Sequence, residues 1–169
     1  LNSDASGKVS VTIEDYFGAQ EKDPRKAVLM SFFATYCEPC KREMPFLAAL
    51  HQTYKAKGLQ VLMVSIDKEA DKIEEAGKLA DAAGVGFPVL SDRFNIVARR
   101  YMIEKLPCVY ILNGAGKVAL VKVGYADDVS KQLLDEVRRQ VGEPASDPVP
   151  ASLSKFFEGA SSATASAGN

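Results

Sequence analysis

Two cysteines separated by two residues, Cys37 and Cys40, form the most reactive pattern in this chain. They directly follow an apolar stretch, residues 28–33, which predicts a buried strand. If a helix begins at Cys37, both sulfurs lie in its first turn, where unpaired backbone N–H groups and the helix dipole stabilise a thiolate. The same turn lets the two sulfurs join as a disulfide. The residue types and their spacing therefore indicate a redox-active dithiol.

The same pattern also occurs in zinc sites, in haem attachment sites and by coincidence. Zinc needs four nitrogen or sulfur ligands. The only histidine, His51, lies ~16 Å from Cys40 if the two share a helix. Haem attachment needs a histidine directly after the second cysteine, where Lys41 stands. Because a predicted strand precedes the pair and a predicted helix follows it, coincidence is disfavoured. We therefore expect a redox pair, with no metal and no cofactor besides the disulfide.

Composition sets the remaining bounds. The chain has 169 residues, of which 47% are hydrophobic, and this fits one domain with a core of its own. With 21 basic and 22 acidic residues the net charge is -1, so we expect no nucleic-acid partner and no attraction to an anionic membrane. No apolar run approaches the roughly 20 residues of a transmembrane helix. Since the chain begins at Leu1 and not with Met, we expect a processed product or a chain shortened for expression, and any signal or anchor segment would have preceded Leu1.

Periodicity and turn residues divide the chain into a linker (1–8), an α/β domain (9–142) and a Pro/Ala/Ser-rich tail (143–169) that we expect to be disordered. The alternative for the tail is a docked helical turn around Leu153, Phe156 and Phe157. The pattern predicts strands over 9–13, 28–33, 60–66, 87–90, 108–112 and 117–123, and helices over 38–56, 69–83, 92–101 and from 127 or 128 to 141. This order predicts a mixed sheet covered by helices. Two acidic residues at strand ends, Asp67 and Asp92, are expected to cap the helices that follow them.

Two segments together resemble the thioredoxin superfamily. Residues 28–45, with Pro45 five positions after Cys40, resemble its active-site segment, and residues 105–118 resemble its cis-proline loop and hairpin. Residues 87–92 with the helix before them, and the CEPC motif followed by Lys-Arg-Glu, are similar to the TlpA/ResA-like thiol-disulfide oxidoreductases. These are exported bacterial proteins that include reductases of cytochrome c maturation. The resemblance implies a thioredoxin fold with a TlpA-type helix/strand insert.

The resemblance also implies roles for individual residues. Cys37 attacks a substrate disulfide and Cys40, the more buried sulfur, resolves the mixed disulfide. Pro107 matches the cis-proline, which leaves the backbone of Leu106 free to pair with an extended substrate segment. Glu43, one turn beyond Cys40, matches a glutamate that relays protons; the alternative is a solvated surface residue. Residues that flank the cysteines complete the predicted substrate contacts: Tyr36, Glu38 and Pro39.

Three positions depart from the superfamily pattern. Tyr36 replaces the tryptophan that commonly precedes the first cysteine. Ser31 stands where thioredoxins proper carry a buried acid, so we expect that proton relay to be absent. Cys108 follows Pro107 directly, and we expect it to pack as a small apolar residue.

The resulting expectation is a monomeric, extracytoplasmic thiol-disulfide oxidoreductase. Because two carboxylates, Glu38 and Glu43, lie near the sulfurs and disfavour thiolates, we expect it to reduce disulfides in exported proteins. The resemblance implies that a membrane dithiol donor, on the periplasmic side or its equivalent, restores its own dithiol. Two alternatives stay open. One is a copper(I)-binding protein that uses Cys37, Cys40 and Cys108, and the other is a peroxiredoxin-like thiol peroxidase.

Overall fold

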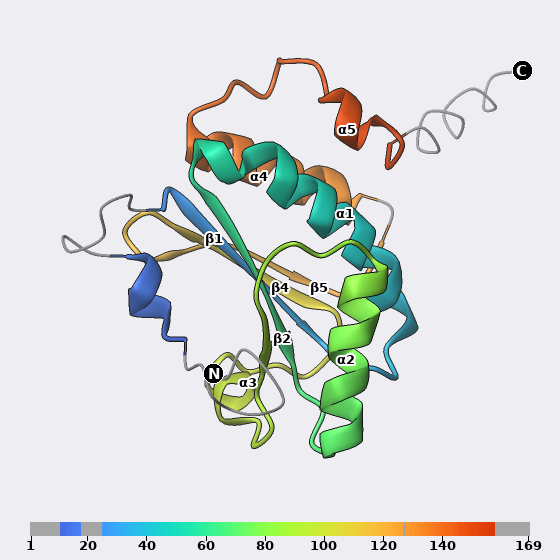
Figure 1. The fold of residues 1–169 in the computed structure, drawn as a ribbon. Coiled ribbons are helices and arrows are strands. Elements are labelled where there is room, and N and C mark those ends of the chain that lie inside the picture. The colour runs from blue at the N-terminus through green and yellow to red at the C-terminus, as the bar shows by residue number, and fades with distance from the viewer. Residues whose placement is uncertain (1–10, 18–24, 127, 158–169) are drawn as a thin grey trace, which may run out of the picture.

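A five-stranded sheet in the order β3-β2-β1-β4-β5 forms the centre of the molecule (Figure 1). The computed structural model describes residues 11–17, 25–126 and 128–157. The strands are β1 (Ala27–Phe33), β2 (Leu59–Ser65), β3 (Val89–Ser91), β4 (Cys108–Asn113) and β5 (Val118–Val123). The α-helices are α1 (Glu38–Tyr54), α2 (Ala70–Ala82), α3 (Ile96–Arg100), α4 (Val129–Val141) and α5 (Ala151–Ser154), with 3-10 turns at Ile13–Tyr16 and Lys55–Lys57.

The middle strand, β1, is buried along its whole length. It pairs in parallel with β2 on one side and antiparallel with β4 on the other. Helices cover both faces of this part of the sheet, which explains why β1 reads as an almost continuous apolar run. In that register Phe32 lies opposite Cys108, so the loop before β4 lies beside the end of β1 and the start of α1.

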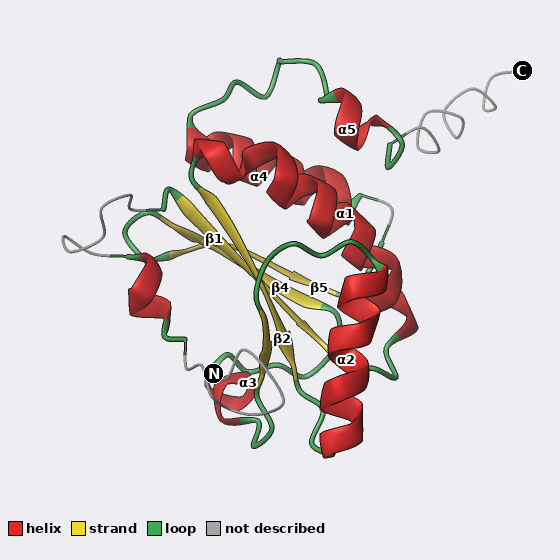
Figure 2. Ribbon diagram, in the orientation of Figure 1, coloured by secondary structure: helices red, strands yellow, loops and turns green. Residues whose placement is uncertain are grey.

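Side chains of β1 alternate between two apolar clusters. Leu29 and Phe33 pack into the larger cluster with α1 and α4, whereas Val28 and Phe32 pack into a smaller one on the other face with α3. Figure 2 shows α1 and α4 together on one side of the strands and α3 on the other. The segment from α2 to β3 supplies the insert that the sequence resemblance implied, because β3 adds a parallel strand beside β2.

The first predicted strand is not found in the described residues. Residues 9 and 10 lie outside them, as does the whole of the predicted linker 1–8, and Ile13 begins a 3-10 turn instead of ending a strand. The physical reason is the Asp15 carboxylate, which accepts a hydrogen bond of 2.6 Å from the backbone N–H of Thr12. A side chain that takes a backbone donor in this way favours a turn over a strand ladder.

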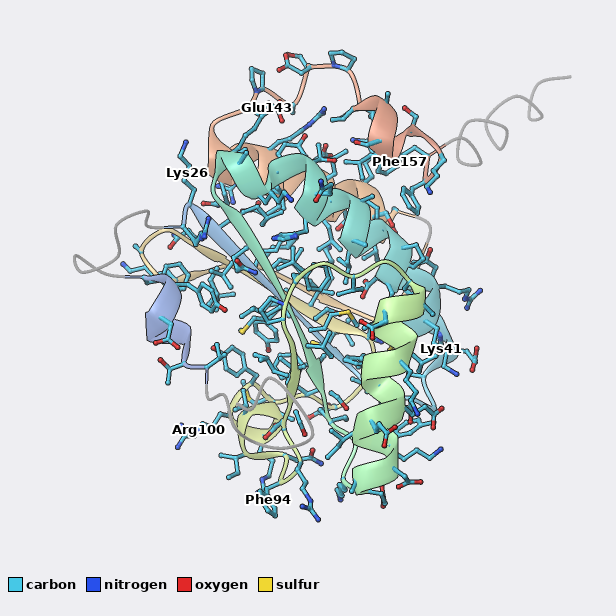
Figure 3. The ribbon with its side chains drawn as sticks, in the orientation of Figure 1. Lys26, Lys41, Phe94, Arg100, Glu143 and Phe157 are labelled. Atoms are coloured by element: carbon cyan, nitrogen blue, oxygen red, sulfur yellow. A yellow bond between two sulfur atoms is a disulfide. The ribbon has the colours of Figure 1, made fainter. Side chains whose placement is uncertain are left out.

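The segment after α4 corrects the expectation of a disordered tail as far as residue 157. It folds back so that α5 packs on α1, and Leu153 is fully buried. The rings of Phe156 and Phe157 meet Phe46 of α1 edge-on, with centroids 5.5 and 6.1 Å apart. Figure 3 labels Glu143 and Phe157 near the two ends of this segment, which we call the strap (residues 143–157). Residues 158–169 lie outside the described part of the chain.

The strap is also held by a buried arginine on α4. Arg138 is 2% exposed and donates hydrogen bonds to the carbonyl oxygens of Asp147 and Pro148, at 3.1 and 2.7 Å. Its Nε also donates to the Tyr54 hydroxyl at the end of α1, at 3.1 Å. One guanidinium thus joins α4, α1 and the strap, so residues 143–157 pack as part of the domain.

Candidate active site

Cys37 and Cys40 are joined by a disulfide at the start of α1, with Cα atoms 5.3 Å apart. Cys37 is the N-cap residue of the helix and Cys40 lies in its first turn. As expected, Cys37 is the more exposed, at 6% against 1%. The buried strand β1 ends at Phe33, so a four-residue turn, closed by a 3.0 Å hydrogen bond from the Cys37 N–H to the Ala34 oxygen, carries the chain to the dithiol.

One backbone donor is directed at the reactive sulfur. The N–H of Cys40 lies 3.3 Å from Cys37 Sγ, in the geometry of a helix cap. Pro39, between the cysteines, has no N–H to add to it. A Cys37 thiolate in this place gains that hydrogen bond and the favourable end of the helix dipole.

The charged residues around the dithiol are paired with one another or lie against rings. Glu38 is exposed, and its carboxylate forms a 2.6 Å ion pair with Lys41. Figure 3 labels Lys41 at this end of the helix. Arg42 lies over the ring of Tyr125, 5.5 Å from its centroid. The two cations that follow Cys40, Lys41 and Arg42, therefore contact other groups and not the sulfurs. The contacts identify the helix dipole and the Cys40 N–H as the main stabilisers of a Cys37 thiolate.

Glu43 is buried. The alternative interpretation, a solvated surface glutamate, is therefore wrong. The residue is 1% exposed, and its Oε2 accepts a 3.0 Å hydrogen bond from Ser31 Oγ of β1. Its other oxygen, Oε1, has no hydrogen-bond partner within the described residues. Burial raises the pKa of Glu43 from 4.5 to about 7, against the smaller opposing effect of the Ser31 hydrogen bond.

This geometry revises the expectation for Ser31. The sequence indicated that the buried acid of thioredoxins proper is missing, because a serine stands at its position. The structure places a buried carboxyl group next to that serine all the same, from helix α1 instead of strand β1. A buried carboxyl group thus lies under the first turns of the helix that carries the dithiol.

The Leu106–Pro107 peptide bond is cis, as the resemblance implied. Pro107 is buried at the start of β4, and Leu106 is half-buried between the two apolar clusters. Because β4 pairs with β1, this loop lies at the end of the strands where α1 begins. Tyr36, which precedes Cys37, is 74% exposed at the same end of the strands. The predicted site residues therefore gather at one end of the sheet.

A polar cleft of about 440 Å³ opens beside Tyr36. Its walls come from the loop after β1, the segment between β2 and α2, the start of α2 and Asn95. They include five charged side chains: Asp67, Lys68, Glu69, Lys72 and Glu75. The two cysteines do not line it. The disulfide is thus nearly buried beside this cleft and does not form part of its walls.

The third cysteine does not join the pair. Cys108 is free and 3% exposed, and it packs into the cluster on the opposite face of the sheet from Cys37 and Cys40. Burial, with a smaller contribution from the charge of Glu43, raises the pKa of its thiol. Among the described residues, no three His, Cys, Asp or Glu side chains are grouped so that they could hold a metal ion. His51 is buried too, with its ring edge against Phe87.

The cap expected of Asp67 is not found, whereas the one expected of Asp92 is. Asp92 accepts hydrogen bonds from the N–H groups of Ile96 and Ala98, at 2.9 and 2.7 Å, at the start of α3. The N-cap of α2 is Glu69, which makes no side-chain cap hydrogen bond. Asp67 instead turns toward the loop before the dithiol and binds Thr35. Sequence reasoning missed this contact because it joins residues 32 positions apart.

Comparisons with known proteins agree with this geometry. Residues 3–121 match the model of the AhpC/TSA family. A relative from Geobacillus kaustophilus named thiol-disulfide oxidoreductase ResA is 31% identical over 110 residues, which are 64% of this chain and 62% of the relative. A Chlorobium tepidum structure named for a thiol:disulfide interchange protein, DsbE, superposes with a TM-score of 0.64 at 27% identity and covers 69% of this chain and 81% of its own.

The solved structures also confirm the fold. A thioredoxin-like protein from Porphyromonas gingivalis is 31% identical and superposes with a TM-score of 0.60, over 69% of this chain and 76% of its own. The predicted thioredoxin fold and the resemblance to ResA-like proteins are therefore confirmed. This chain spans 62% of the length of the Geobacillus relative. None of the helices in the described residues is long and apolar enough to cross a membrane.

Proposed function

This chain belongs to the AhpC/TSA family, and from that premise we propose that it is a thiol-disulfide oxidoreductase that works through Cys37 and Cys40. The observation that carries the proposal is the disulfide at the N-terminus of α1, beside the cis-Pro107 loop. The names of the relatives, thiol-disulfide oxidoreductase and thiol:disulfide interchange protein, support the same reaction class.

The reaction transfers two electrons in two exchange steps. The Cys37 thiolate attacks one sulfur of a substrate disulfide, and the other substrate sulfur leaves as a thiolate. The Cys40 thiolate then attacks Cys37 Sγ, which releases the second substrate sulfur and closes the Cys37–Cys40 disulfide. The substrate gains two electrons and two protons, and the protein loses them.

Glu43 is the group that we assign to proton transfer in this cycle. It follows Cys40 by one helical turn, and its pKa of about 7 allows it to accept or release a proton near neutral pH. We propose that it takes the proton of the Cys40 thiol as that thiol attacks. We assign substrate contact to the residues around the sulfurs, of which Tyr36 and Glu38 are exposed and Pro107 is buried: Tyr36, Glu38, Pro39, Leu106 and Pro107.

We propose the reducing direction, with disulfides of exported proteins as substrates and a role like that of reductases in cytochrome c maturation. A buried carboxyl group under the helix and cations that are engaged elsewhere leave the thiolate form weakly stabilised. A dithiol whose reduced form is weakly stabilised is a strong reductant. The protein acts as an extracytoplasmic monomer, with no cofactor besides its disulfide, and a membrane dithiol donor returns it to the reduced form.

Trapping the mixed disulfide tests the exchange reaction. Reduced Cys40→Ser protein, mixed with a peptide disulfide, should accumulate a covalent adduct that dithiothreitol releases. Cys37→Ser should form none, and Cys108→Ser should behave as wild type because its sulfur lies on the other face of the sheet. An adduct on Cys37→Ser, or none on Cys40→Ser, would contradict the proposal.

The reduction potential tests the direction. A value near that of thioredoxin, about −270 mV, supports a reductase, and one near that of DsbA, about −120 mV, overturns the direction. Rapid, catalytic consumption of hydrogen peroxide would favour the peroxidase alternative. Tight stoichiometric retention of copper(I) without exchange would favour the metal-binding one.

A further inference from the structure

The buried carboxylate of Asp67, in the loop that follows β2, binds the loop between β1 and the dithiol. Asp67 is 4% exposed, two residues beyond the end of β2. Its two oxygens accept hydrogen bonds from the Thr35 N–H, at 3.0 and 3.3 Å, and from Thr35 Oγ1 at 2.9 Å. Ser65 Oγ also donates a hydrogen bond to Asp67 Oδ2, at 2.8 Å. We call Ser65, Asp67 and Thr35 the anchor.

The anchor fixes the segment that places Cys37. Thr35 lies in the four-residue turn between β1 and α1, and it is itself 4% exposed. The backbones of the same two loops are also joined by a hydrogen bond of 3.0 Å from Ile66 N–H to the Phe33 oxygen. Because Asp67 accepts from both hydrogen-bond donors of Thr35, its N–H and its hydroxyl, Thr35 has little freedom to move relative to β2.

A buried carboxylate is costly unless donors surround it. Asp67 makes no cap hydrogen bond to α2, the helix that follows it, so capping does not explain why its carboxylate is buried. Its contacts in the described residues join it to Thr35 and to Ser65, and Thr35 lies two residues before the sulfur that reacts. The arrangement therefore ties a charged group to the geometry of the dithiol.

We propose that Asp67 is a positioning residue for the Cys37–Cys40 couple and acts through Thr35. By fixing the turn, it holds Cys37 at the start of α1, within bonding reach of Cys40 Sγ. A dithiol that is already arranged for ring closure forms its disulfide more readily. The anchor thus stabilises the disulfide relative to the dithiol and makes the protein a stronger reductant. The inference rests on the proposed exchange function.

Asp67→Asn tests the proposal, because the amide keeps the shape but removes the negative charge and one of the two acceptor oxygens that Thr35 and Ser65 share. The equilibrium with a dithiothreitol redox buffer should shift about tenfold toward the dithiol, which corresponds to a potential about 30 mV less negative. Loss of the negative charge, which is bound to Thr35 two residues before Cys37, acts in the same direction, since it favours the thiolate. Thr35→Val separates the two effects: it keeps the charge and removes only the hydroxyl, and it should shift the equilibrium in the same direction by a smaller factor.

Two variants serve as controls. Thr35→Ser keeps the hydroxyl and should leave the equilibrium close to wild type. Asp92→Asn changes a carboxylate of similar burial, 5% exposed, at the end of the neighbouring strand, but one that caps α3. It should lower the melting temperature without moving the redox equilibrium.

The outcomes separate the anchor from the function. If wild type exchanges disulfides but Asp67→Asn keeps its equilibrium, or shifts it no further than Asp92→Asn, the anchor role is wrong and the function stands. If wild type forms no mixed disulfide at all, the function fails first. Should Asp67→Asn not fold, the Thr35→Val and Thr35→Ser pair decides, and equal equilibria for the two would overturn the proposal.

Discussion

Helix α1 carries the Cys37–Cys40 disulfide on its first turn and lies under the strap at Phe46 and beyond. At the first end, the buried Glu43 leaves one oxygen without a partner in the described residues, and Cys37 keeps 6% of its surface exposed. At the other end, Phe46 and Leu50 are buried and the Tyr54 hydroxyl is bonded to Arg138. One helix thus combines a reactive end, where a carboxyl group can change its protonation state and two sulfurs their oxidation state, with an end whose packing stabilises the fold.

The largest effect is expected at the packed end. Phe46→Ala removes a side chain that is 1% exposed and that meets both aromatic rings of the strap. The free energy of unfolding should fall by about 4 kcal/mol, since a large aromatic side chain is replaced by a cavity. The reduction potential should stay within a few millivolts of wild type. Urea unfolding of the oxidised protein and a redox titration measure the two quantities.

Phe94→Ala is the matched control, because Phe94 is 70% exposed. Its loss should change the free energy of unfolding by less than about 0.5 kcal/mol. The division between the two ends of α1 would be wrong if Phe46→Ala moved the potential strongly while the stability stayed unchanged.

The same division shows how far the sequence could predict this molecule. Local patterns sufficed for the Cys37–Cys40 pair, for the hairpin at 113–116 and for the loop at Pro107, because each depends on neighbouring residues. The strap was only the alternative interpretation of the tail, because its stability comes from Phe46, far away in the chain, and from the buried guanidinium of Arg138, and the tail's composition reveals neither contact. Its apolar residues, beginning with Leu153, were the one signal that a docked segment exists.

The site shows the same limit. The spacing of Glu43 from Cys40 was visible, but its burial follows from the packing of α1 on β1, so surface and buried interpretations could not be separated. Asp67 carried a misleading local signal, since an acidic residue between a strand and a helix resembles a cap. What decided its role was a parallel strand pairing that brings Thr35 next to it.

The second largest effect is a pH dependence of the stability, which we expect from Glu43 at the dithiol end of α1. Glu43 has its pKa raised to about 7 in the folded protein, against an ordinary value of 4.5. Between these two values the folded protein binds a proton that the unfolded chain has lost, so the free energy of unfolding must fall as pH rises. The fall from pH 5 to pH 8 should be roughly 2 to 3 kcal/mol, since each pH unit corresponds to about 1.4 kcal/mol.

Glu43→Gln should remove this part of the pH dependence, measured by urea unfolding of the oxidised protein at a series of pH values. Glu38→Gln, five residues earlier and exposed, should retain it. A pH profile of Glu43→Gln that matches wild type would show that Glu43 is not the titrating group, and the proton-transfer role would then lose its physical basis.

The smallest effect concerns the hydroxyl that meets Glu43. Ser31 Oγ donates to Glu43 Oε2, and this hydrogen bond favours the ionised carboxylate. Ser31→Ala should therefore move the midpoint of the pH-dependent stability upward, by about 0.5 to 1 pH unit if the bond contributes about 1 kcal/mol. Ser65→Ala is the matched control: it removes an equally buried hydroxyl from β2, but one bonded to Asp67, and should leave the midpoint in place. A downward shift for Ser31→Ala, or equal shifts for both variants, would mean that the strand does not tune the acid of the helix.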